Sequence, residues 1–259
     1  MPQPILTLTT DFGASDHYVG AMKGVILGIC PRAQIVDVCH DVTAFQIIEG
    51  AYVIAQAYEC FPKKTVHVVV VDPGVGTERR PILVEAAGQF FIGPDNGVLS
   101  MIYSRQKHRV RLIANETYFR KPVSATFHGR DIFAPVAAHL AAGAAPSRMG
   151  KQIHDYLQPD FVEPRRSGER TWMGRILKID RFGNIVTNFR PALLAASPAF
   201  AVTIGRRKIS TLVRTYAEAQ PGELVLIVGS SGYLEISINQ GSAAHQLGCH
   251  VGQPAAARL

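Results

Sequence analysis

The chain has 259 residues, 47% of them hydrophobic, which is enough to bury a substantial core in one large domain or two smaller ones. Its formal net charge of +7 comes from short basic clusters without interleaved aromatic residues, so the composition does not favour a nucleic-acid-binding protein. No segment approaches the roughly 18 apolar residues of a membrane span and no secretory signal pattern opens the sequence, so we expect a cytoplasmic protein without a membrane partner.

The first half of the chain alternates between strand-like and helix-like segments. Apolar residues recur at helical spacing in two of them, each of which is closed by a proline. The valine run 68–71 predicts a strand that is buried on both faces. This βαβαβ alternation predicts a mainly parallel sheet covered by helices. The predicted segments are a strand at 5–13, a helix at 16–31, a strand at 34–42, a helix at 44–62, a strand at 65–76, two strands around a turn at 81–97 and a helix at 130–143.

The character of the sequence changes at residues 158–170, which are rich in proline and charge and show no periodicity. Beyond them, short strand-like segments separated by Gly-containing turns predict a smaller all-β domain that resembles a barrel. We therefore predict an α/β N-terminal domain at 1–163, a linker at 164–170 and a C-terminal β-barrel domain at 171–259. The predicted strands of the second domain are 172–180, 184–189, 200–205, 207–213, 223–229 and 233–239.

Polar residues follow several of the strands predicted for the first domain. Because ligands bind at the carboxyl ends of the strands in an open parallel sheet, we expect a binding cleft along this edge. A single acidic residue at such a place often only caps the next helix, whereas several along one edge favour a site. The residues concerned are Asp11, His40 with Asp41, Asp72, and Asp95 with Asn96.

Several familiar sites are not supported by the motifs. The segment "DPGVG" matches neither the P-loop nor the dinucleotide-binding pattern, and no GxSxG elbow is present. A metal site could be assembled from His40, Asp41, His128 and Asp131, but their spacing matches no metal-binding motif. In "KIDRFGNIVTNF", the residues around 180–184 fit an ordinary Gly-Asn hairpin and a polar clamp for an amino acid or nucleoside about equally well.

Six motifs occur together in one order: "LTTDFGASDHYVGAMKGVI", "VDVCHDV", "VVDPGVGTERR", "GPDNGVLS", "FHGRD" and "IDRFGNIVTN". In this combination, the chain resembles the S-adenosyl-L-methionine hydroxide adenosyltransferase family, the relatives of the fluorinating and chlorinating enzymes. Each motif alone is modest, but the ordered set is specific and extends from Leu6 to about Ala244.

The resemblance implies hydrolysis of S-adenosyl-L-methionine to adenosine and L-methionine, with neither a metal nor a cofactor. It implies an N-terminal α/β domain followed by a C-terminal β-barrel. It also implies a homotrimer, with each site lying between the N-terminal domain of one subunit and the C-terminal domain of its neighbour. Product adenosine could then be retained through purification.

The resemblance also assigns residues. The water-activating set falls on Asp72, Arg79 and His128, with Arg79 favoured over Arg80 by its spacing from Asp72. The implied substrate-binding positions divide into those near the ribose, the methionine group and the adenine. They are Asp11 for the ribose hydroxyls, Asp16, Asp180 and Ser230 for the methionine group, Phe182, Asn184 and Tyr216 for the adenine or its pocket, and Phe45 as a pocket wall.

Two further functions remain open at this point. A halogenating enzyme on the same scaffold is disfavoured because Asp72 and His128 stand where the halogenating relatives have tyrosines, and because Gly129 offers no hydroxyl to hold a halide. The other is a protein that binds S-adenosyl-L-methionine or adenosine without turnover.

Overall fold

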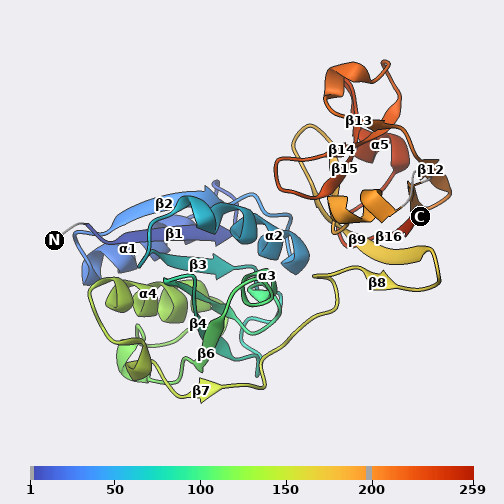
Figure 1. The fold of residues 1–259 in the computed structure, drawn as a ribbon. Coiled ribbons are helices and arrows are strands. Elements are labelled where there is room, and N and C mark those ends of the chain that lie inside the picture. Colours follow the sequence, from blue (N-terminus) through green and yellow to red (C-terminus); the bar gives the residue numbers. More distant parts are fainter. Residues whose placement is uncertain (1–2, 197–199) are drawn as a thin grey trace. The chain divides into compact units, whose positions relative to one another are not determined.

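The computed structural model describes residues 3–196 and 200–259. The chain divides into two compact units, Met1–Pro159 and Asp160–Leu259 (Figure 1). Within the segment predicted as a linker, strand β8 (Arg165–Arg166) pairs with β9 (Thr171–Ile179) of the second unit. The domain limits proposed from the sequence stay a prediction.

A seven-stranded sheet forms the centre of the first unit (Figure 1). The βαβαβ alternation is confirmed, and β2, β1, β3 and β5 are parallel neighbours in that order. The prediction of a mainly parallel sheet is wrong, because β4, β6 and β7 extend the sheet through antiparallel pairings. The strands are β1 (Ile5–Thr10), β2 (Gln34–Cys39), β3 (Val66–Val70), β4 (Pro81–Ala86), β5 (Gln89–Pro94), β6 (His108–Leu112) and β7 (Gln152–Ile153).

The tight turn between β4 and β5 explains the mixed sheet. Ala87 and Gly88 have φ angles of 54° and 75°, and two consecutive positive φ values are typical of the hairpin turns that join antiparallel strands. The hairpin leaves an edge of β4 open for β6, whose sequence "HRVRL" contains one fully buried side chain, Val110. A strand this polar has a weak hydrophobic pattern, which is why the sequence did not reveal it.

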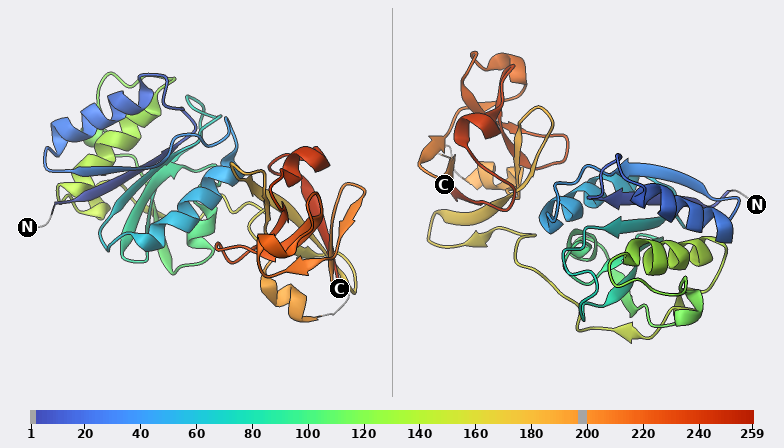
Figure 2. Two further views of the ribbon diagram at one scale, coloured as in Figure 1. Left: turned by 90° about the horizontal axis from the view of Figure 1, so that it is seen from above. Right: turned by 180° about the vertical axis from the view of Figure 1, so that it is seen from behind.

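Helices cover both faces of this sheet (Figure 2). Helices α1 (Tyr18–Ile29) and α4 (Ala134–Ala141) pack together on one face, where they bury a hydrophobic core against β1 and β3. Helix α2 (Ile47–Ala57) contacts β1, β2 and β3. The remaining helical segments are short: η1 (Tyr58–Cys60), α3 (Ser100–Tyr103), η2 (Glu116–Tyr118), the π-helical turn η3 (Gly129–Phe133) that leads into α4, and η4 (Pro146–Arg148).

One histidine is fully buried in the centre of this sheet. The Nδ1 atom of His67 lies 2.7 Å from the Thr7 hydroxyl, Nε2 lies 3.3 Å from Gln89 Oε1, and the ring stacks on Phe91. Burial lowers the pKa of His67 to about 4, because the charged imidazolium would lose its hydration. His67 is therefore neutral in the folded protein at neutral pH.

We expect His67 to make the first unit sensitive to acid. Between pH 6.5 and about 4, the unfolded chain binds a proton at this histidine that the folded chain does not, so the free energy of unfolding falls as the pH falls through this window. The full loss is about 3 kcal/mol. Urea unfolding of the wild type and of His67→Asn at pH 7 and pH 4.5 measures it. The variant should lose clearly less stability on acidification, and equal losses would contradict the prediction.

The second unit is built around a nine-stranded sheet, and its strands agree with the predicted all-β character. The strand order is β12-β11-β16-β9-β10-β15-β14-β13, with β8 beside β9. This path has two ends, so the barrel stays a prediction. The further elements are β10 (Ile185–Thr187), η5 (Pro191–Ala196), β11 (Ala201–Ile204), β12 (Arg207–Ile209), β13 (Leu212–Val213), η6 (Tyr216–Glu218), β14 (Leu224–Val228), β15 (Leu234–Ile238), α5 (Ala243–Leu247) and β16 (Pro254–Arg258).

The sequence missed α5 and β16 of this unit. Strand β16 pairs with both β9 and β11 and contributes Ala255 and Ala257 to the core. Its sequence "PAAAR" has a low strand propensity, so its place is decided by neighbouring strands rather than by local preference.

Across the described ranges of both units, no helix has the length and apolar content that a bilayer crossing requires.

Candidate active site

Asp72 and Arg79 form a buried ion pair at the end of β3. Asp72 directly follows the fully buried Val71, and its side chain is only 4% exposed, against 8% for that of Arg79. Arg79 Nε donates to Oδ1 of Asp72 over 2.9 Å, and Nη2 donates to Oδ2. Two parallel bonds of this kind fix the orientation of the carboxylate as well as its charge. The Arg79 guanidinium also lies over the ring of Phe133, 5.3 Å from its centroid.

His128 lies on the other side of the same guanidinium. Arg79 Nη2 lies 2.7 Å from Nδ1 of His128. A guanidinium has only donors, so Nδ1 accepts this bond and the neutral ring carries its proton on Nε2. Burial lowers the pKa of His128 and the Arg79 charge lowers it further, which favours this neutral form. The structure therefore brings together all three residues that the resemblance identifies as water-activating.

The turn after β3 positions Arg79 through a close backbone contact. Gly76 has a φ of 79°, and a Cβ at this position would overlap the carbonyl oxygen of Ala125. Only glycine combines this conformation with such an approach. The contact holds the turn against the segment that leads to His128, so residues far apart in the sequence meet at one carboxylate.

Arg80 points to different partners. Its guanidinium donates to Asp95 over 2.7 Å and to Asp155 over 2.9 Å. Asp95 also accepts from the backbone N–H of Leu157. Arg79, and not Arg80, is the arginine beside Asp72, and Asp95 belongs to a separate group of contacts.

Asp11 and Phe45 lie close to this cluster. Asp11 follows β1, and its Oδ2 accepts the backbone N–H of Phe45 over 2.9 Å. Burial raises the pKa of Asp11, and the charge of Asp72 adds to that rise against the opposing hydrogen bonds. Phe45 has a φ of 67°, and the residue is 69% exposed. An exposed aromatic residue in the left-handed region is strained, and such strain is concentrated at functional sites. Asp16 is exposed in the loop before α1.

Aromatic residues that the sequence did not single out surround this edge of the sheet. Phe12, Tyr18 and Phe127 form a cluster with ring centroids 5.1–6.1 Å apart. Phe127 immediately precedes His128, and Phe12 immediately follows Asp11. The only signal for Phe12 and Phe127 was their adjacency to the motif carboxylate and histidine.

Asn96 and His40, which were also predicted at the strand ends, have structural partners, whereas Asp41 is exposed. Asn96 donates to the carbonyl of Val71 over 2.8 Å, and His40 Nδ1 lies 2.8 Å from the Thr10 hydroxyl. Asp131 is fully buried and accepts from Arg130 and from the backbone N–H of Ser124. Within residues 3–196 and 200–259, no three His, Cys, Asp or Glu side chains gather as a metal site.

The candidates of the second unit form a separate group. Asp180 Oδ1 accepts the backbone N–H groups of Phe182 and Asn184, both over 2.9 Å, and Oδ2 accepts from the Asn184 amide over 2.8 Å. These bonds build the hairpin that the sequence allowed for. The same turn also lines a cavity of about 540 Å³, together with Tyr216 and Ile238. Phe182 is 76% exposed, and Ser230 is exposed on a nearby turn of the chain.

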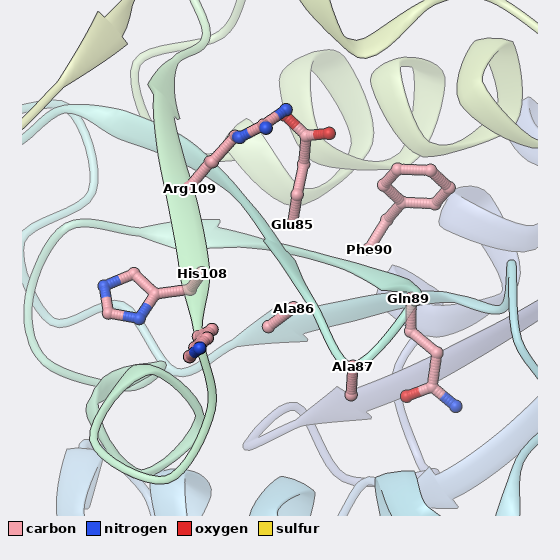
Figure 3. A pocket seen from close by; sticks show the side chains of 9 residues that line it. Glu85, Ala86, Ala87, Gln89, Phe90, His108 and Arg109 are labelled. Atoms are coloured by element: carbon pink, nitrogen blue, oxygen red, sulfur yellow. The ribbon is translucent and has the colours of Figure 1, made fainter.

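A further hollow of about 390 Å³ lies beside the β4–β5 turn (Figure 3). Its lining includes Glu85, Gln89, His108 and Arg109. It is found at the start of β5, whereas Asp72 follows the end of β3, and these two strands are parallel. The hollow therefore lies at the opposite edge of the sheet from the Asp72 cluster.

Comparisons with known proteins match the two units of the chain to the two domains of one family. Residues 6–150 match the model of the SAM hydroxide adenosyltransferase N-terminal domain, and residues 174–256 match that of the C-terminal domain. An (R)-S-adenosyl-L-methionine hydrolase of Salinispora tropica is 37% identical, with 95% of each chain covered. A fluorinase of an Actinoplanes species is 29% identical, with 93% of each covered. The crystal structure of an uncharacterized conserved protein from Thermotoga maritima superimposes with a TM-score of 0.86 at 37% identity, covering 98% of this chain and 100% of that one.

Proposed function

The chain belongs to the SAM hydroxide adenosyltransferase family, and on this premise we propose that it hydrolyses S-adenosyl-L-methionine to adenosine and L-methionine. The observation that carries the proposal is the cluster of Asp72, Arg79 and His128 at the carboxyl edge of the sheet. The reaction is proposed to need neither a metal nor a cofactor.

Water activation is the step that this cluster would perform. The sulfonium group already leaves as a neutral thioether, so what the reaction lacks is a nucleophile at neutral pH. Asp72 would accept a proton from water as general base, on the lone pairs that Arg79 does not use. With its proton on Nε2, His128 would donate a hydrogen bond to the water oxygen and orient it.

The proposed reaction is a displacement at the ribose C5′. The water oxygen forms a bond to C5′ while the C5′–S bond breaks, and its electron pair stays on sulfur. The proton from water passes to Asp72 and then to solvent. Holding the water in line with the breaking bond would lower the barrier by several kcal/mol, on the order of effective-molarity gains. Arg79 would stabilise negative charge as the hydroxide character develops.

The remaining candidates would bind the substrate. Asp11 would hold the ribose hydroxyls, Asp16, Asp180 and Ser230 the methionine group, and Phe182, Asn184 and Tyr216 the adenine. The homotrimer with shared sites is part of the proposal, and the mass of the protein in solution tests it. The cavity beside Asp180 and Tyr216 supports a ligand site in the second unit.

The direct test is to incubate the purified protein with S-adenosyl-L-methionine and separate the products by chromatography. The proposal predicts equal amounts of adenosine and methionine, unchanged by a chelator. Chloride and fluoride are added in parallel reactions. A 5′-halo-5′-deoxyadenosine would instead indicate a halogenase. Bound substrate without any methionine after many hours would indicate a binding protein.

Two substitutions of Phe45 test its proposed role as a pocket wall and distinguish the effect of backbone strain from the effect on substrate binding. Glycine adopts the left-handed conformation without penalty, so Phe45→Gly should be about 1 kcal/mol more stable than Phe45→Ala. Both variants lose the ring and should raise KM for S-adenosyl-L-methionine several-fold to a similar extent. Thermal unfolding and steady-state kinetics measure the two effects. An unchanged KM in both variants would remove Phe45 from the site.

A further inference from the structure

Strand β15 contains a buried carboxylate that the motifs did not reveal. Glu235 is only 7% exposed in the sequence "LEISI", where its neighbours are apolar. Tyr216 Oη donates to its Oε2 over 3.5 Å, at the limit of a hydrogen bond. A Cβ at Gly229 would overlap Oε1, so the carboxylate lies directly against the turn that carries Ser230. Glu235 is thus next to three of the proposed substrate-binding positions, including Asp180, whose charge acts on it.

Among the described residues, no cationic side chain is found in the set of groups that act on this carboxylate. Burial raises the pKa of Glu235, and the Asp180 charge raises it further. Tyr216 and Ser231 are the other groups that act on it, and neither is cationic. A buried carboxylate without a cationic partner costs several kcal/mol of stability. A cationic group of a bound ligand would offset this cost.

A second unsatisfied group lies on the same face of the sheet. Ile185 pairs with Ile236 and Val186 with Glu235, so the antiparallel register places Asn184 opposite Ser237. Ser237 is fully buried, and its hydroxyl finds no partner in the described part of the chain. Asn184 lines the cavity of the second unit, and Glu235 and Ser237 lie on the same face of the sheet as Asn184.

Asp180 is already occupied by its own turn. Three N–H groups donate to its two oxygens, so much of its acceptor capacity is spent on holding the hairpin. Within the described residues, Glu235 accepts a long bond from Tyr216 and is acted on by the Ser231 hydroxyl, and none of its partners is a backbone N–H of its own turn. Glu235 therefore has more free hydrogen-bond acceptor sites than Asp180.

We propose that Glu235 binds the α-ammonium group of the substrate's amino-acid moiety, sharing it with Asp180. This inference rests on the proposed function for the identity of the ligand. It makes Glu235 a specificity residue that selects for a primary ammonium at the amino-acid end of the ligand.

Binding measurements on the full chain test this. Titration calorimetry is carried out in the Asp72→Asn background, to prevent turnover. It compares S-adenosyl-L-methionine, its deaminated 2-oxo analogue and adenosine. Glu235→Gln should weaken the affinity for S-adenosyl-L-methionine about ten- to a hundred-fold, which is the usual contribution of a hydrogen bond to a charged group. The affinities for the 2-oxo analogue and for adenosine should stay nearly unchanged. Glu223→Gln, immediately before β14, is the matched control and should change the affinity for none of them.

Gly229→Ala provides a second variant that leaves Glu235 in the sequence. Gly229 does not need the left-handed region, so alanine strains the turn only by displacing the carboxylate. It should reproduce the selective loss, and adding it to Glu235→Gln should cost little more. Equal weakening of all three ligands, or unchanged binding of S-adenosyl-L-methionine by Glu235→Gln, would overturn the inference.

Failure of the proposed function would look different. If the wild type binds S-adenosyl-L-methionine but forms no adenosine, the hydrolase proposal fails while the binding pattern still decides the role of Glu235. If the ligand does not bind at all, both proposals are overturned.

Discussion

Asp72→Asn should reduce adenosine formation about a thousand-fold while leaving the Kd for S-adenosyl-L-methionine within a few-fold of the wild type. The amide keeps the shape of the side chain but cannot accept a proton from water, and loss of a general base typically costs 10²–10⁴ in rate, as an order of magnitude. Single-turnover kinetics gives the chemical step, and calorimetry gives the affinity.

The control for this variant is its folding. Replacing one member of a buried ion pair leaves Arg79 uncompensated, which costs about 3–5 kcal/mol of stability. The assays are therefore run well below the Tm of the variant, determined separately by thermal unfolding. Normal turnover by a folded Asp72→Asn protein would show that the carboxylate is not the base.

Arg79→Gln should have the second largest effect, a loss of about a hundred-fold or more in kcat. It removes the two bonds that orient Asp72 and the bond that fixes the His128 tautomer. It also removes the positive charge that would stabilise the developing hydroxide, and a single electrostatic donor of this kind is worth about 10²–10³ in rate.

Arg80→Gln is the matched control, because it changes the neighbouring residue in the same way. Arg80 is bonded to Asp95 and Asp155, so its loss should lower the Tm with little effect on kcat. If the two variants lost the same amount of activity, a general disturbance of the 72–80 turn would explain both, and the special role of Arg79 would be excluded.

Much of the fold could be predicted because the local signals were strong. The valine run 68–71 and the apolar spacing of α1 and α2 identified their elements, and helix-closing prolines marked their ends. The antiparallel half of the first sheet could not be predicted as such. Its direction is decided by the turn at Ala87 and Gly88 and by pairing along β4, which are tertiary properties.

The candidate site shows the same division. Asp72 could be placed from its position after a buried strand. The convergence of Arg79 and His128 depends instead on the close contact of Gly76 with Ala125. This contact joins residues far apart in the sequence, so no local sequence pattern predicts it. Glu235 was missed because a single acid in an apolar strand resembles an exposed alternating position. Only the packing shows that it is buried.

The most direct test of the account is the origin of the new oxygen atom in the product. The wild-type protein is incubated with S-adenosyl-L-methionine in water enriched in oxygen-18, and the adenosine is analysed by mass spectrometry. Attack of an activated water at C5′ predicts one oxygen-18 atom per adenosine, located in the 5′-hydroxyl group. Adenosine without the label, or methionine released without adenosine, would contradict it.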